Sequence, residues 1–243
     1  MRLDHYIRDT YKLTGNKAQQ LIKEWYVSVN MLLIQKPAYD VSGSEDISLR
    51  EEKRIHWVSR SAGKLDGFIE KIWINTWIIG ANCLDVGAST WGFTQVLLER
   101  GAIHVDAVDV GTDQLHSMIR DDVRVTSYEQ VDIRDFISLQ WAHRYDIIVC
   151  DASFISLHDI LTSILSYADN HTHIILLWKP QFEVWKLHLQ PRWVPKDEKI
   201  VIKKMQEWEE FLVYNNCKIS QKEKSTVIGE AGNEEWLYLI EKQ

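Results

Sequence analysis

The sequence predicts an α/β protein with a mostly parallel sheet, preceded by a small α+β domain. From residue 60 onward, apolar segments typical of buried strands alternate with amphipathic segments typical of helices, at the spacing of βαβ units. Before that point the composition shifts at the charged stretch REEKRIHW, near residues 50–58. We therefore expect a first domain at 1–52, a linker at 53–58 and a second domain at 59–243.

The first domain is predicted to contain two short helices and short strands. LDHYIRDTYKL (3–13) and NKAQQLIKEWY (16–26) have helical patterns, with Asn16 as a suitable N-cap for the second. VSVNMLLIQKP (27–37) and DISLR (46–50) flank a turn-rich segment and are typical of strands.

In the second domain, strands and helices are expected to alternate with helices on both faces of the sheet. The predicted helices cover 60–73, 92–102, 158–169 and 195–216. The predicted strands cover 81–88, 104–111, 123–129, 145–153, 173–181, 217–228 and 235–242. Gly101 is placed to close the second of these helices, and Pro195 lies near the first turn of the last.

The charge distribution bears on possible partners. The 243-residue chain has a net charge of −7, which disfavours a generally basic nucleic-acid-binding protein. Residues 1–60, however, hold ten Lys and Arg against eight Asp and Glu. The N-terminal segment is therefore the more suitable place for an anionic partner.

No membrane, metal or disulfide chemistry is indicated. No apolar run approaches the roughly 18–20 residues that span a bilayer, and the N-terminal residues lack the apolar segment of a signal peptide. The cysteines, Cys83, Cys150 and Cys217, are far apart and odd in number, so free thiols in a reducing cytoplasm account for them.

Polar residues follow the predicted strands in succession. Alone, each could be a turn, a helix cap or a solvated side chain. Because the carboxyl ends of parallel strands meet at one edge, where ligands bind, they are expected to form one group. In chain order they are Asp85, Gly87, Ser89 and Thr90, then Asp109, Asp132, Asp151 and Lys179.

The glycine-rich turn suits an adenosine ligand that lacks a pyrophosphate. GASTWG (87–92) lacks the second glycine of the dinucleotide fingerprint, and no GK[ST] follows as in a P-loop. A nucleoside at the second and third strands and a charged amino-acid tail at the first describe S-adenosylmethionine. The predicted cofactor-binding residues are Asp85, Gly87, Ser89, Thr90, Trp91, Gly92, Asp109, Val110, Asp132 and Ile133.

Several motifs together resemble the TlyA family, hemolysin-like rRNA methyltransferases whose catalytic domain is similar to the FtsJ-type 2′-O-methyltransferases. They are CLDVGASTWGFTQVLLERGA (83–102), AVDVGTDQL (107–115), CDASFISL (150–157), KPQFE (179–183) and GNEEW (232–236). RLDHYI, AQQLI, VSVN, KP and DIS are similar to the family's S-four-like RNA-binding domain, and VSRSAGKL (58–65) is similar to its junction segment.

The resemblance implies a Rossmann-like, S-adenosylmethionine-dependent methyltransferase domain that acts on RNA, with ribosomal RNA or a ribosomal subunit as partner. It places the catalytic set at Lys64, Asp151, Lys179 and Glu235. We expect Lys179 to be the base, its pKa lowered by burial and by Lys64, and the two acids to hold the lysines. An ordinary ion-pair network is the alternative. RNA contacts are predicted at Arg2, Lys17, Lys23, Asn30, Lys36 and Arg60. In-line methyl transfer needs no metal, and the oligomeric state stays open.

Two departures from the family leave a second function open. Trp91 stands at a family glycine. If that position has positive φ, the backbone is strained; if it need only be small, the indole would fill the methionine end of the pocket. The segment 184–198 lacks the family's glycines. The alternative is a catalytically impaired RNA-binding protein. Membrane-active hemolysis has no spanning segment or basic amphipathic helix to support it.

Overall fold

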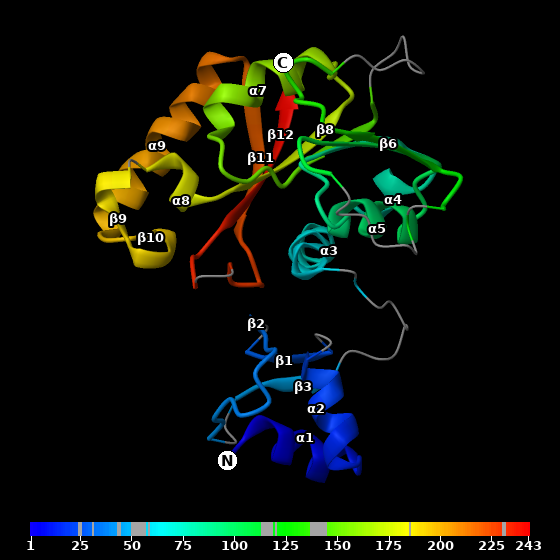
Figure 1. Ribbon diagram of the computed structural model, residues 1–243, viewed down its shortest axis with the longest axis vertical. Helices are drawn as coiled ribbons and strands as arrows, with labels where there is room; N and C mark the ends of the chain where they lie inside the picture. The colour runs from blue at the N-terminus through cyan, green and yellow to red at the C-terminus, as the bar shows by residue number, and fades with distance from the viewer. Residues whose placement is uncertain are drawn as a thin grey trace. The chain divides into compact units, whose positions relative to one another are not determined.

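The protein divides into two compact units, Met1–Trp57 and Val58–Gln243 (Figure 1). The computed structural model describes residues 1–23, 26–30, 32–42, 45–49, 57, 59–112, 119, 121–136, 145–184, 186–229 and 232–243. Of the linker predicted at 53–58, only Trp57 lies among these residues.

The N-terminal unit packs two helices, α1 (Leu3–Tyr11) and α2 (Gly15–Lys23), with a three-stranded antiparallel sheet. Its strands lie in the order β2-β1-β3, where β1 is Val27–Val29, β2 is Leu32–Leu33 and β3 is Ile47–Leu49. Its core includes Leu3, Ile7, Ala18, Leu21, Ile22, Val27 and Val29. This is a small α+β unit with a core of its own.

Two local predictions in this unit are wrong. The segment predicted as one strand over 27–37 is two short antiparallel strands, because Asn30 has φ 50° and turns the chain. The helix α2 begins before Asn16, since the Thr14 hydroxyl accepts a hydrogen bond from the Lys17 N–H and takes the capping role.

The larger unit contains a seven-stranded sheet in the order β11-β12-β8-β7-β4-β5-β6. The strands are β4 (Asn82–Val86), β5 (His104–Asp109), β6 (Val125–Glu129), β7 (Ile147–Cys150), β8 (His173–Trp178), β11 (Cys217–Lys224) and β12 (Trp236–Lys242). The first five pair in parallel, and β12 runs antiparallel to both of its neighbours. The predicted mostly parallel sheet is confirmed.

Helices lie on both sides of this sheet (Figure 1). On one side are α3 (Arg60–Ile72) and α5 (Gly92–Glu99), and on the other are α7 (Leu157–Ser166) and α9 (Glu198–Tyr214). Side chains of alternate strand residues, such as Ile148 and Cys150, share a buried cluster with Leu161 of α7 and Trp208 of α9. Apolar side chains of the sheet therefore pack against the layer of α7 and α9.

Short elements were not predicted. They are α4 (Asn75–Ile78), α8 (Pro180–Glu183), the strands β9 (Leu189–Gln190) and β10 (Val194–Pro195), and the 3-10 helices Lys186–His188 and Pro191–Trp193. Each is too short to show a period in the sequence. The helix α9 begins later than predicted, because the Asp197 carboxylate accepts from the Lys199 N–H at 2.9 Å and caps it, while Pro195 belongs to β10.

Candidate active site

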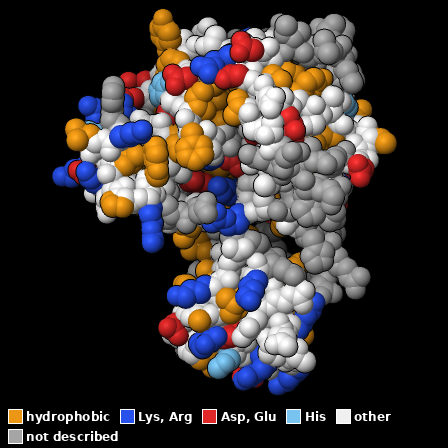
Figure 2. All heavy atoms as spheres, viewed as in Figure 1, with side chains coloured by type: hydrophobic (Ala, Val, Ile, Leu, Met, Phe, Trp, Pro, Cys, Tyr) orange, Lys and Arg blue, Asp and Glu red, His pale blue; other side chains and the backbone are white. Residues whose placement is uncertain are grey.

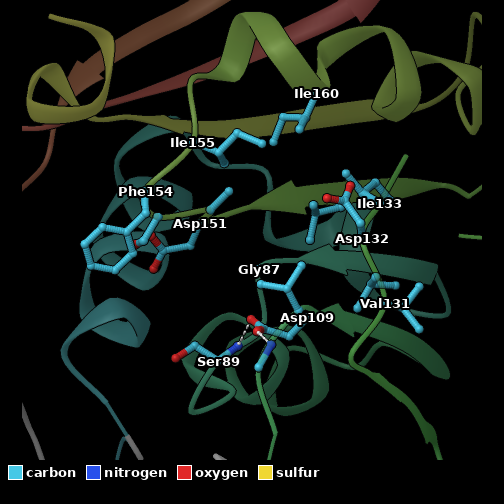
Figure 3. A pocket seen from close by; sticks show the side chains of 16 residues that line it. Gly87, Ser89, Asp109, Val131, Asp132, Ile133, Asp151, Phe154, Ile155 and Ile160 are labelled. Atoms are coloured by element: carbon cyan, nitrogen blue, oxygen red, sulfur yellow. Dashed lines mark hydrogen bonds between the residues drawn. The ribbon is translucent and has the colours of Figure 1, made fainter. Parts of the chain in front are cut away.

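A cavity of about 290 Å³ opens at the carboxyl ends of the parallel strands (Figure 3). The strand order reverses between β4 and β7, the place where ligands bind in open α/β sheets. The volume is just below the range of about 300–1,000 Å³ for small-molecule sites. The cavity is lined by residues 86, 87, 89, 108–111, 131–133, 151–155 and 160.

The glycine-rich turn after β4 brings two strand ends together. Gly87 has φ +77°, and a Cβ there would lie 2.8 Å from the Cα of Ala152. Only glycine accommodates both the positive φ and this close approach. The turn therefore closes one side of the cavity against the segment that follows β7.

Asp109, at the end of β5, is fixed in the cavity by the backbone. Its Oδ2 accepts a hydrogen bond from the Ser89 N–H at 2.8 Å, and its Oδ1 accepts one from the Gly111 N–H at 2.6 Å (Figure 3). A carboxylate has about four acceptor sites, so two N–H donors leave capacity for further donors. The geometry suits a pair of hydroxyl groups.

The segment after β6 supplies one carboxylate and an apolar surface. Arg134 pairs with Asp132 at 2.6 Å and holds the pKa of that carboxyl below its usual range. Ile133 is buried, and Val110, which also lines the cavity, is largely exposed. Two apolar side chains next to an ionised acid suit a flat ring that carries an N–H donor.

Asp85 lies outside the cavity lining and is fully buried. Its Oδ2 accepts from the Thr94 hydroxyl at 2.6 Å, while Oδ1 has no partner among the described residues. Burial, opposed in part by Thr94, raises the pKa of Asp85 to about 7. An unpartnered buried oxygen is costly, so this carboxyl suits a cationic or N–H donor that arrives with a ligand.

Three of the predicted cofactor residues, Thr90, Trp91 and Gly92, also lie outside the cavity lining. Thr90 is exposed. Trp91 has φ 68° and its side chain is only 2% exposed. Of the two consequences considered for Trp91, the left-handed backbone is therefore present, and the indole does not line the cavity. A Cβ on Gly92 would lie 2.1 Å from the Ser59 Oγ, at the start of α3.

The four predicted catalytic residues form two ion pairs. Lys64 Nζ of α3 lies 2.6 Å from Glu235 Oε2, just before β12. Lys179 Nζ, after β8, lies 2.6 Å from Asp151 Oδ1, after β7. Both lysines are at most 8% exposed, and Asp151 lines the cavity.

Two residues that the sequence did not indicate complete this network. Gln181 lies two residues after Lys179, and its side-chain N–H donates to Glu235 Oε1 at 2.9 Å. The Lys179 ammonium donates to the Ser153 Oγ at 2.8 Å. Gln181 therefore links the segment that carries Lys179 to the Lys64–Glu235 pair. The only sequence signal for it was its place inside KPQFE.

Glu183 anchors the short helix α8 that carries Gln181. Its carboxylate accepts from the Ser156 hydroxyl and from the Leu157 N–H, the latter at 2.9 Å. Glu183 thus caps the N-terminus of α7 and ties the KPQFE segment to the DASFISL segment. This contact holds the strand ends with Lys179 and Asp151 in register.

The predicted RNA-binding residues belong to both units of the chain. Arg60 belongs to α3 of the larger unit and the other five to the smaller one. Arg2 is paired with Asp4 at 2.8 Å, and the Asn30 side-chain oxygen accepts from the Asp46 N–H. Lys23 and Lys36 are exposed, and Lys17 is half-buried. Figure 2 shows Lys and Arg side chains on the visible face of residues 1–57.

Within the part of the chain that the structure describes, no group of three or more His, Cys, Asp or Glu residues is arranged to hold a metal ion. The three cysteines are buried free thiols. No described helix has the length and apolar character needed to cross a bilayer.

Comparisons with a family model, with curated relatives and with solved structures agree on one family. The model of the FtsJ-like methyltransferases matches residues 57–242. The 23S rRNA (cytidine-2'-O)-methyltransferase TlyA of Campylobacter jejuni is 35% identical, covering 98% of each chain. The 16S/23S rRNA (cytidine-2'-O)-methyltransferase TlyA of Mycobacterium tuberculosis is 40% identical over 76% of this chain and 68% of its own. A solved Streptococcus thermophilus structure named a hemolysin superposes with TM-score 0.72 at 28% identity, covering 100% of this chain and 88% of its own.

Proposed function

Because the chain belongs to the TlyA family of FtsJ-like methyltransferases, we propose that it methylates a ribose 2′-hydroxyl of ribosomal RNA with S-adenosylmethionine. The relatives are named for a cytidine target, and we extend this target to the present chain. The observation that carries the proposal is the pair of buried lysine–carboxylate contacts beside a cavity with strand-end acids.

The residues around the cavity fit the cofactor. Asp109 would accept hydrogen bonds from the ribose hydroxyls, while Val110 and Ile133 would contact the adenine faces and Asp132 would accept from its amino group. The Asp85 Oδ1, which has no partner in the described part of the chain, suits the ammonium of the amino-acid tail. When bound, the cofactor supplies an electrophilic methyl group on a sulfonium.

Lys179 is our candidate for the base. A ribose hydroxyl is a very weak acid, so its proton must leave as the oxygen attacks the methyl carbon. In this scheme the proton passes to the Lys179 Nζ. The resulting ammonium is stabilised by Asp151 Oδ1 at 2.6 Å and by Ser153 Oγ at 2.8 Å.

Lys64 orients the acceptor in this scheme. Glu235 accepts hydrogen bonds from both Lys64 and Gln181. Because Gln181 holds the Glu235 carboxylate in place, the ion pair fixes the orientation of the Lys64 ammonium. The remaining N–H donors of Lys64 are available to an oxygen of the acceptor ribose. Alignment of nucleophile, methyl carbon and leaving sulfur then supplies most of the catalysis, without a metal.

The N-terminal unit serves in this account as an RNA-binding domain. Its exposed lysines, Lys23 and Lys36, are suited to phosphate contacts, which are the main source of affinity for RNA. We further propose a ribosomal subunit or its RNA as the partner and the cytoplasm, where ribosomal RNA is found, as the location.

The alternative of an impaired methyltransferase scaffold rested on Trp91 and on segment 184–198. Trp91 has φ 68°, but its indole is buried and does not line the cavity, so it does not fill the methionine end of the pocket. The two buried lysine–carboxylate pairs beside the cavity favour activity on RNA over this alternative.

The direct test compares methyl transfer to ribosomal RNA by the natural protein and by Lys179→Ala. Loss of a general base is expected to lower kcat by about 10²–10⁴-fold, with the KM for the cofactor nearly unchanged. Lys71→Ala is the control, because Lys71 is an exposed lysine of α3 paired with Glu223. Full activity of Lys179→Ala would remove Lys179 from the mechanism.

A further inference from the structure

A small hairpin between α8 and α9 carries an aromatic and cationic surface. It runs from Lys186 to Lys196, and its strands β9 and β10 pair Gln190 with Val194 and Leu189 with Pro195. Neither the cofactor cavity nor the lysine–carboxylate network includes a residue of this hairpin. The proposed reaction therefore leaves its role unexplained.

The hairpin is positively charged in an acidic protein. Residues 184–196 contain Lys186, Arg192 and Lys196 but no Asp or Glu, whereas the whole chain has a net charge of −7. Lys186 and Arg192 are exposed and form no ion pair with any described carboxylate. The Lys196 ammonium, in contrast, donates to the Leu187 carbonyl oxygen within the hairpin.

Aromatic rings connect the hairpin to the cavity. Trp193 is 41% exposed, and the Lys186 ammonium lies 5.5 Å from the centroid of its ring. The Phe154 ring, 81% exposed, lies 6.3 Å from that of Trp193 and also lines the cavity. An exposed aromatic surface thus extends from the cavity rim to the hairpin.

The backbone holds Trp193 in an unusual conformation. Arg192 and Trp193 have φ values of 69° and 63°, in the left-handed region that disfavours large side chains. The Asn233 side-chain amide donates to the Trp193 carbonyl oxygen at 3.1 Å. Asn233 lies two residues before Glu235, so the segment that carries a proposed catalytic residue also fixes the position of the indole.

From these contacts we infer that Trp193 stacks on an unpaired base of the substrate RNA close to the methylated nucleotide, while Lys186 and Arg192 bind adjacent phosphates. The inference rests on the proposed function, which makes RNA the substrate. An aromatic face beside unpaired cations is the combination that binds single-stranded nucleic acid, because every base has a π-face and every linkage a negative charge.

Binding of the full-length protein to a fluorescently labelled, single-stranded 12-nucleotide RNA tests the role of Trp193. Trp193→Ala is expected to weaken binding about 5- to 100-fold, and Trp193→Phe, which keeps a stacking ring, by less than about threefold. Trp73→Ala is the matched control, because Trp73 is 88% exposed and lies at the far end of α3 from Lys64. It should bind like the natural protein.

The salt dependence of RNA affinity tests whether Lys186 and Arg192 bind phosphates. Replacing Lys186 and Arg192 together by Gln should make the slope of log affinity against log salt shallower by about 1.4, since each single-strand phosphate contact contributes about 0.7. Lys203→Gln, on the exposed side of α9, should leave the slope unchanged.

The inference is overturned if Trp193→Ala binds the RNA as tightly as the natural protein while its unfolding temperature is also unchanged. Unchanged RNA affinity with lost binding to phosphatidylglycerol vesicles would overturn it too, by assigning the surface to a membrane. Methyl transfer to ribosomal RNA by the natural protein is measured separately. Trp193-dependent RNA binding without any methyl transfer would contradict the proposed function and leave the inference supported.

Discussion

Asp85 shows how one buried group links folding, cofactor binding and pH. Its pKa is about 7 in the folded protein and close to 4 in an unfolded chain. Between these values the unfolded chain carries the ionised carboxylate and the folded protein carries the neutral acid. The contribution of Asp85 to stability is therefore complete below about pH 4 and is lost as pH rises through 7.

The first residue-scale prediction concerns this linkage. Relative to Asp85→Asn, the cofactor-free natural protein should lose stability between pH 5 and pH 8, because it must bury a charge at the higher pH. Unfolding temperatures of both proteins at the two pH values measure the difference. Cofactor affinity should rise over the same interval only in the natural protein, since an ammonium favours ionised Asp85. Parallel pH profiles for the two proteins would contradict this account.

The second residue-scale prediction uses two tryptophans with the same backbone conformation. Trp91 and Trp73 have φ 68° and 59°, but Trp91 is 2% exposed and Trp73 is 88% exposed. Glycine relieves roughly 1–2 kcal/mol of backbone strain, whereas removal of a buried indole costs about 3–5 kcal/mol. Trp91→Gly should therefore destabilise the protein, and Trp73→Gly should leave it equally or more stable.

Chemical denaturation measures the unfolding free energy of the two glycine variants and of the natural protein. A Trp91→Gly protein more stable than the natural one would show that strain outweighs burial at this position.

At the scale of elements, the α3–α5 contact positions Lys64. A Cβ on Gly92 would lie 2.1 Å from the Ser59 Oγ, 2.2 Å from the Ser61 Oγ and 2.7 Å from the backbone N of Ala62. The start of α3 therefore needs glycine on α5. Because Lys64 lies one turn further along α3, a displacement of this contact also moves the lysine away from Glu235.

Gly92→Ala is accordingly expected to cost about 1–3 kcal/mol of unfolding free energy and to lower methyl transfer. Gly15→Ala is the control, since nothing lies within 4 Å of a Cβ at Gly15. Denaturant titration, monitored by a signal from the larger unit, gives the unfolding free energy of each variant. The rate of methyl transfer is measured for both variants as well. Equal stability of Gly92→Ala and the natural protein would contradict the packing described.

The sequence predicted those features that depend on local pattern. Strand alternation placed Asp109, Asp132 and Asp151 at one sheet edge, because the carboxyl ends of parallel strands must meet there. Asn16 was predicted as the cap of α2, whereas the helix begins at Gly15 and the Thr14 hydroxyl accepts from the Lys17 N–H. Gln181 could not be predicted, since its role depends on a contact with Glu235, 54 residues away.

The hairpin at 186–196 shows the same limit of sequence pattern. Its strands are two residues long, and its turn places Arg192 and Trp193 at positive φ, where sequence preference favours glycine or asparagine. A tertiary contact from Asn233 stabilises it instead. Burial of Trp91 likewise depends on tertiary packing that composition and spacing do not encode.

At the scale of the whole molecule, the two units have separate cores. The cluster around Leu3, Ile7 and Ile22 belongs to residues 1–57, and the cluster around Ile148, Leu161 and Trp208 belongs to the larger unit. The excess of basic residues lies in the N-terminal segment. Cofactor binding and RNA affinity are therefore expected to be separable.

Removal of residues 1–57 should leave cofactor affinity within about twofold and weaken binding to ribosomal RNA by at least about tenfold, since phosphate contacts dominate RNA affinity. Calorimetry with the cofactor and filter binding with ribosomal RNA measure the two properties. Unaltered RNA affinity would remove the N-terminal unit from substrate recognition.

The most direct measurement locates the methyl group on the product. Ribosomal RNA is incubated with the full-length protein and S-adenosylmethionine labelled in its methyl group, then hydrolysed in alkali. A methyl group on the 2′-oxygen blocks cleavage at that linkage, so the account predicts that the label is recovered in an alkali-resistant dinucleotide and is lost with Lys179→Ala. Label in mononucleotides, which indicates a methylated base, or no label despite cofactor binding, would contradict it.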